Sequence, residues 1–105
     1  MTIPENLKQC YQALKEILPL QEQQEFAKTP FRNLSKYHHS LGLWIRNNWK
    51  LWGTEKNPLR DLLKREGIVH PDEMSSHILK YCWSQFRIDQ SNIDHEQVRI
   101  ENKSW

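Results

Sequence analysis

The sequence contains only two cysteines, Cys10 and Cys82, among its 105 residues. Two thiols are too few for a disulfide framework or for a zinc site built from cysteines. No apolar run approaches the roughly 18 residues that a membrane-spanning helix needs. The first residues, Met1 to Asn6, also lack the charged and then apolar segments of a signal peptide. We therefore expect a cytoplasmic protein without a membrane span and without a cofactor.

Strand-like alternation longer than four residues and internal repeats are missing as well. In their place, apolar residues recur at the 3.6-residue spacing of helices along nearly the whole chain. A chain of 105 residues suffices for one ordinary domain and leaves no room for a second core. The sequence predicts an all-α fold, in which residues 1–105 form a single compact domain of five or six short helices.

Capping and proline signals place the first two helices. Thr2 followed by Glu5 has the pattern of a capping box, which predicts that the first helix is capped by Thr2. Pro19 should end this helix, because a proline ring excludes the helical conformation from the preceding residue. A short amphipathic helix is expected to follow over residues 20–28.

The longest helix is expected in the middle of the chain. It should begin at about Phe31 or Leu34 and end at Leu51, with Gly53 as its C-terminal cap. On this helix, steps of 100° per residue gather most apolar side chains into one arc about 140° wide.

Three residues of that arc are assigned structural roles. Trp44 and Trp49 should belong to the core, and Asn48 falls between them. A buried amide must find a hydrogen-bond partner. We therefore expect Asn48 to be buried and bonded to the backbone of a loop.

Two helices and a third, terminal one are expected in the second half. Asn57 and Gly67 bracket the first of them, as an N-terminal cap and a C-terminal stop. The next should run from Pro71 to about Phe86. A short polar connection should then lead to a last helix capped by Asp94.

Charge is distributed unevenly along the chain. Residues 28–65 carry nine basic and two acidic side chains, net +7, whereas residues 1–27 carry a net −2 and residues 66–105 a net −3. The acidic ends could fold back and neutralise the middle. Alternatively, the middle presents a basic face to an acidic partner.

The face of the long helix opposite its apolar arc is the candidate partner-binding surface. It combines basic side chains with one leucine, and protein interfaces favour an arginine and a central apolar anchor. A phosphate backbone would need no leucine. The predicted surface consists of Lys36, His39, Leu43, Arg46, Asn47 and Lys50.

Two blocks of sequence are specific enough to indicate a family. The first, over residues 37–52, reads YHHSLGLWIRNNWKLW, and the second, over residues 67–75, reads GIVHPDEMS. Together they resemble a family of small, uncharacterised bacterial proteins and domains, over about residues 30–86. This resemblance implies a bacterial or phage source and a compact helical domain, and it implies no activity.

The triplet His70-Pro71-Asp72 matches the motif with which J-domain co-chaperones engage Hsp70. A helix start explains the triplet more simply, because proline suits the first helical turn and a carboxylate favours the positive end of the helix dipole. We therefore interpret His70 and Asp72 as structural residues.

Two other interpretations of the histidines concern chemistry. Arg32 and His38 fit the spacing of HEPN-type ribonucleases, in which the histidine would be the general base and the arginine would steady the phosphate. The four histidines 38, 39, 70 and 77 do not have the close pairing of zinc ligands, so no metal site is predicted.

The leading hypothesis is a non-enzymatic bacterial protein that binds another protein through its basic central face. The biology that fits best is an immunity or antitoxin-like inhibitor, whose partner is a cognate toxin domain with an acidic surface. One alternative is a helical nucleic-acid-binding protein, which the basic middle with its interleaved tryptophans favours. The other alternative is the HEPN-like ribonuclease; the leading hypothesis assigns no catalytic residue.

Overall fold

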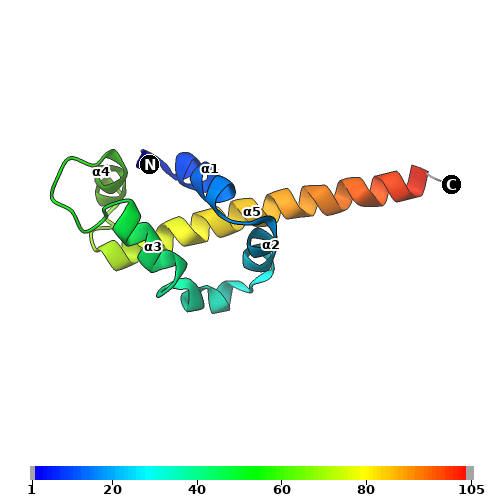
Figure 1. Ribbon diagram of the computed structural model, residues 1–105, viewed down its shortest axis with the longest axis horizontal. Coiled ribbons are helices and arrows are strands. Elements are labelled where there is room, and N and C mark those ends of the chain that lie inside the picture. The colour runs from blue at the N-terminus through cyan, green and yellow to red at the C-terminus, as the bar shows by residue number, and fades with distance from the viewer. Residues whose placement is uncertain (1, 104–105) are drawn as a thin grey trace.

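The structure is a computed structural model that describes residues 2–103, with side chains described for residues 2–91. Within this range the chain forms five α-helices and one 3₁₀ helix and contains no strand (Figure 1). The predicted all-α fold is therefore confirmed. The elements are α1 (Leu7–Ile17), α2 (Leu20–Lys28), η1 (Phe31–Tyr37), α3 (Leu41–Asn48), α4 (Pro58–Arg65) and α5 (Pro71–Lys103).

Helix α5 organises the domain. It is 33 residues long, and α1, α2, η1 and α3 all contact it. Figure 1 shows these elements gathered around its first half, while its second half extends away from them. The molecule therefore measures 60 × 25 × 24 Å along its principal axes. Among the described residues, no helix combines the length and the apolar character that crossing a membrane would require.

The core lies between α5 and the helices that cover it. Aromatic rings fill the part near α1 and α2, where Phe26 packs edge-on against Tyr37 and Phe86, with ring centroids 4.9 and 5.9 Å apart. Burying a side chain of this size stabilises the fold by about 1.5–3 kcal/mol. The side chains that are fully buried include Cys10, Leu14, Phe26, Ile45, Trp49, Leu51, Leu59, Leu63, Met74, Ile78 and Cys82.

Helix α1 begins later than predicted. Its N-terminal cap is Asn6, whose Oδ1 accepts a hydrogen bond of 2.9 Å from the amide of Gln9. The Gln9 side chain in turn accepts from the amide of Glu5. The capping role predicted for Thr2 is therefore wrong, because Asn6 supplies the same acceptor one turn closer to the apolar stripe. The predicted stop at Pro19 is confirmed, since α1 ends at Ile17.

The long helix predicted between residues 31 and 51 is divided in two. The 3₁₀ helix η1 ends at Tyr37, and α3 begins at Leu41 after a short turn. In a continuous α-helix the carbonyl of His38 would accept from the amide four residues later. Here that carbonyl accepts from the guanidinium of Arg46 at 3.1 Å, so a side-chain bond takes the place of the helical one.

The end of α3 also differs from the prediction. The C-cap is Trp49, and the left-handed residue that follows it is Lys50, with φ 53°, and not Gly53. The amide of Leu51 then bonds back to the carbonyl of Arg46 at 3.0 Å, which closes a Schellman turn.

Helix α4 follows the prediction at both ends. Asn57 caps its start, where its Oδ1 accepts from the amide of Arg60. Gly67, with φ 85°, ends it in the same Schellman turn that Lys50 forms after α3. The matching bond joins the amide of Ile68 to the carbonyl of Leu63 at 3.0 Å. Gly67 is thus the residue that this turn favours.

Helix α5 continues through the segment predicted to be a polar connection, so the cap predicted at Asp94 is wrong. The polar residues there are bonded to other helices and do not form a loop. The guanidinium of Arg87 donates to the carbonyl of Ala27 at 3.1 Å. The carboxylate of Asp89 accepts from the hydroxyl of Tyr11 and lies 3.6 Å from the ammonium of Lys15.

The two Schellman turns generate a prediction about stability. A left-handed conformation costs a residue with a side chain roughly 1–2 kcal/mol, and glycine avoids this cost. Replacing Lys50 by glycine should therefore raise the free energy of unfolding by about 0.5–1 kcal/mol in urea denaturation, and Gly67→Ala should lower it by about 1 kcal/mol. A loss of stability in Lys50→Gly would contradict the assigned backbone conformation.

Candidate functional site

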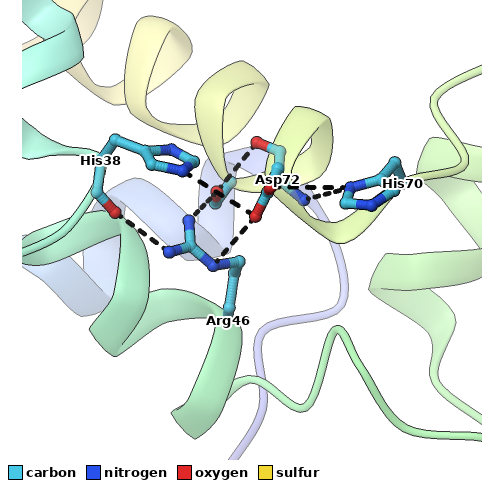
Figure 2. A network of polar contacts seen from close by, with 5 residues as sticks. His38, Arg46, His70 and Asp72 are labelled. Carbon is cyan, nitrogen blue, oxygen red and sulfur yellow. Dashed lines mark hydrogen bonds and ion pairs between the residues drawn. The ribbon is translucent and has the colours of Figure 1, made fainter.

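The carboxylate of Asp72, at the start of α5, is the centre of a polar network that joins both sequence blocks (Figure 2). Its Oδ1 lies 3.5 Å from Nε of Arg46 and 3.9 Å from Nε2 of His38. Its Oδ2 lies 3.9 Å from Nδ1 of His70. Three residues that were singled out separately in the sequence are thus brought around one carboxylate.

The guanidinium of Arg46 is buried, with only 4% of the residue exposed. Its Nη1 donates to the hydroxyl of Ser75 at 2.8 Å, and its Nη2 donates to the carbonyl of His38. The Ser75 hydroxyl donates onward to the carbonyl of Asp72 at 3.0 Å. The arginine therefore links α3, the turn before it and the first turn of α5.

Gly42 makes room for this arginine. A Cβ atom at Gly42 would lie 3.2 Å from Nη1 of Arg46 and 3.2 Å from the carbonyl of Tyr37. Nine in ten Cβ contacts are longer than this. A side chain at this position would therefore press on the guanidinium and on the turn that precedes α3.

His70 acts as a helix cap. Its Nδ1 accepts from the amide of Asp72 at 3.1 Å, and its carbonyl accepts from the amide of Met74. Since Nδ1 is an acceptor in this bond, the neutral ring carries its proton on Nε2. The ring also contacts Trp52 edge-on, with centroids 5.9 Å apart. The structural role expected for His70 and Asp72 is thus the start of α5, and Asp72 additionally faces Arg46.

The exposed position predicted for Arg46 is wrong, and so is the buried position predicted for Asn48. The side of α3 that faces the core is formed by Gly42, Ile45, Arg46 and Trp49. This is a rotation of about one residue, or 100°, from the predicted arc. The close approach that Gly42 permits turns Arg46 inward and leaves Asn48 on the surface, where its amide donates to the carbonyl of Trp44.

Asn57 has the role that was predicted for Asn48. It is only 4% exposed, and its Nδ2 donates to the carbonyls of Trp49 at 3.0 Å and of Lys50 at 3.4 Å. It therefore both caps α4 and holds the loop after α3. Its position before a proline indicated the cap, but nothing in the local sequence indicated the bonds to the loop.

The other residues of the predicted partner-binding surface are exposed. Leu43 is 44% exposed. The ammonium of Lys36 lies over the ring of its neighbour Tyr37, and the ring of His39 stacks edge-on against His38. The remaining members, also exposed, are Asn47 and Lys50. Of the two predicted core tryptophans, Trp49 is fully buried and Trp44 is partly buried against it.

Of the clefts that adjoin the network, two contain residues of the predicted sites. The larger, of about 490 Å³, lies beside the loop after α3 and is described below. The smaller, of about 280 Å³, is lined by Arg32, His38 and Lys80 among others. The two residues that fit the ribonuclease pattern therefore share a cleft.

Neither thiol has the accessibility and the low pKa of a reactive cysteine. Cys10 and Cys82 are both buried and free. Burial raises the pKa of Cys10 to about 12 and the pKa of Cys82 well above its usual value. Both therefore remain protonated near neutral pH. Within the described residues, no three histidine, cysteine, aspartate or glutamate side chains gather so as to hold a metal ion.

The buried arginine generates a prediction for a double-mutant cycle. Arg46→Met and Asp72→Asn should be non-additive in the free energy of unfolding, with a coupling energy of about 1–2 kcal/mol. The control is the exposed pair Lys15 and Asp89, for which the same substitutions should couple by less than about 0.5 kcal/mol. Additive effects of Arg46 and Asp72 would show that their contact contributes nothing.

The two asparagines generate a second prediction. Asn57→Ala should lower the free energy of unfolding by about 2–3 kcal/mol, because it removes a helix cap and the buried hydrogen bond to the carbonyl of Trp49. Asn48→Ala should change it by less than about 0.5 kcal/mol, as is usual for an exposed residue. Thermal and urea denaturation of both variants measure the difference. Equal losses would contradict the assignment of the loop to Asn57.

A comparison with models of known protein families assigns the chain to one of them. A family model described as a domain of unknown function (DUF6794) matches residues 3–86, which is most of the sequence. Comparisons with curated proteins and with solved structures gave no match. The matched range ends where α5 leaves the core at Phe86, and it contains both blocks that indicated an uncharacterised family. The chain belongs to the DUF6794 family of domains of unknown function.

Proposed function

We propose that the protein binds the acidic surface of another protein through the exposed side of α3 and the loop after it. The observation that supports this best is the exposure of Leu43, which is 44% accessible on a side that otherwise carries basic and amide groups. A leucine gains nothing from contact with water, whereas apolar centres with polar rims are typical of protein interfaces.

A second apolar side chain extends this surface. Asn47 lies one helical turn after Leu43, and it lines the same cleft as Trp52. Trp52 is 55% exposed. Tryptophan is among the residues that contribute most to binding at protein interfaces. Leu43 and Trp52 are therefore proposed as the two apolar anchors.

The positive charge of residues 28–65 supports an acidic partner. Of their nine basic side chains, only Arg46 lies within ion-pair distance of a carboxylate in the described part of the chain. Of the acidic residues of the two ends, Asp72 pairs with Arg46, whereas Asp89 pairs with Lys15 outside the middle and leaves the other cations without an ion pair among the described residues. Unpaired cations attract an acidic surface and speed its association.

The burial of Arg46 weakens the nucleic-acid alternative. A protein that follows a phosphate backbone uses a row of accessible lysine and arginine side chains. With Arg46 turned inward, α3 itself retains no accessible lysine or arginine, and the exposed cations that flank it in the sequence are Lys36 in η1 and Lys50 directly after the helix. Two cations beside an exposed leucine suit a protein interface better than a nucleic-acid groove.

The biological role that we propose is inhibition of a bacterial toxin domain. Inhibition requires only that a rigid surface cover the functional site of its partner, and one small helical domain is sufficient for this. The partner is then a toxin domain whose functional site has an acidic surface. No catalytic step belongs to this role.

A ribonuclease is the second candidate, because Arg32 and His38 line one cleft together with Lys80. His38 also lies 3.9 Å from the carboxylate of Asp72, which could orient its ring. In this role His38 would be the general base and Arg32 would bind the phosphate.

Binding is tested with the tagged protein in cytoplasm of its own source, followed by affinity measurements on the captured partner. Leu43→Ala should weaken binding roughly tenfold, because it exposes the partner's apolar contact. Leu20→Ala is the matched control, since Leu20 is 66% exposed on α2 and should be neutral. Lys36→Ala should mainly slow association and reduce its salt dependence.

Other outcomes separate the alternatives. Recovery of nucleic acid alone, with Leu43→Ala silent, would favour nucleic-acid binding. Cleavage of RNA by the purified protein, lost in His38→Ala but retained in His39→Ala, would favour the ribonuclease. A captured protein that binds Leu43→Ala and Leu20→Ala equally well would contradict the proposed surface.

A further inference from the structure

The larger cleft lies between the loop after α3 and helix α4. Three unpaired cations line it, namely Lys50, Lys56 and Arg60, together with one acidic side chain, Glu55. Three positive charges and one negative charge leave a net charge of +2. Arg46 also lines the cleft, but it already forms an ion pair with Asp72.

Arg60 is the unusual member of this set. It is only 6% exposed, so its guanidinium is nearly removed from water. Its Nη1 donates to the carbonyl of Lys50 at 3.3 Å and its Nη2 to the carbonyl of Glu55. Its Nε has no hydrogen-bond partner, and no carboxylate in the described part of the chain lies within ion-pair distance. A buried charge without a counter-charge is costly.

Holding the loop does not by itself require this charge. The carbonyl of Lys50 already accepts from the neutral amide of Asn57 at 3.4 Å and from the amide of Gly53 at 3.1 Å. Neutral donors therefore already serve the carbonyl of Lys50, whereas the carbonyl of Glu55 accepts from Arg60. The guanidinium adds a positive charge that none of these carbonyls neutralises.

Gly53 of the loop lies directly beside this guanidinium. A Cβ atom at Gly53 would lie 3.4 Å from Nη1 of Arg60 and 3.3 Å from the carbonyl of Lys50. Glycine at this position therefore keeps the space beside Nη1 free of side-chain atoms. The ammonium groups of Lys50 and Lys56 belong to exposed residues that line the same space.

We propose that this cleft binds a small molecule through its phosphate group. A phosphate ester carries a charge of about −1.5 to −2 near neutral pH, which matches the net +2 of the lining. The volume of about 490 Å³ is typical of small-molecule sites and exceeds what a phosphate group alone fills. Arg60 offers directional donors to the oxygen atoms, and the two lysines add mobile charges at the opening.

The cleft shares Asn47, Lys50 and Trp52 with the proposed protein-binding surface, but binding of phosphate does not require the protein partner. The experiment therefore uses the purified protein alone. Inorganic phosphate is titrated at constant ionic strength while the backbone amides of residues 50–57 and the indole of Trp52 are followed by NMR. We expect saturable shifts confined to the cleft, with a dissociation constant on the order of 1 mM.

Variants that each remove one charge identify the site. Lys56→Ala and Arg60→Gln should raise the dissociation constant for phosphate at least about fivefold. Lys64→Ala is the matched control: Lys64 is exposed on α4 outside the cleft, and its loss should have no effect. Lys50→Gly should weaken phosphate binding while it stabilises the fold, a combination that a purely structural role would not produce.

Two further ligands test whether the cleft prefers a phosphate group to other anions. Succinate, a dicarboxylate of similar charge, should bind at least about fivefold more weakly than phosphate, and a nucleoside monophosphate should bind more tightly than phosphate alone. Equal binding of succinate and phosphate would overturn the assignment to phosphate. Unsaturable shifts, or equal losses in Lys64→Ala and Lys56→Ala, would overturn the site itself.

Discussion

The fold of the central part depends on the burial of one guanidinium. Arg46 can lie inside because Ser75 and the carbonyl of His38 accept hydrogen bonds from its guanidinium, while the carboxylate of Asp72, 3.5 Å from Nε, is its counter-charge. These groups come from the turn before α3 and from the first turn of α5, so bonding the arginine fixes how the two segments meet α3. It breaks the helix before α3, and it places α3 on the first turn of α5. The absence of a side chain at Gly42 allows that contact to be close.

The parts of the fold that the sequence predicted are those that local chemistry determines. Pro19 ends α1, and Asn57 and Gly67 bracket α4, because proline, an amide cap and a left-handed glycine act within one turn. The rotation of α3 was not predictable in this way. A hydrophobic pattern always assigns arginine to the exposed side, and the partner that overrides this preference, Asp72, lies 26 positions further along the chain.

The same distinction holds for the candidate sites. The exposure of Leu43 and of its basic neighbours follows from helical spacing, even with the face rotated by one residue. The cleft does not follow from any spacing. Its cations come together only because Asn57 bonds the carbonyls at the end of α3 and Arg60 bonds those of the loop. Hydrogen bonds from side chains to carbonyls 5 to 10 positions away leave no pattern in a sequence, and so the cleft was missed.

The end of α3 shows where stability and a binding role conflict. The turns after α3 and α4 close with the same backbone bond, and both need a left-handed residue. After α4 that residue is Gly67, which adopts the conformation without cost, whereas after α3 it is Lys50, which does not. The lysine lines the cationic cleft, where glycine would contribute no charge. Strained backbone conformations are commonly retained at functional sites. The left-handed Lys50 therefore agrees with the binding role that we propose for the cleft.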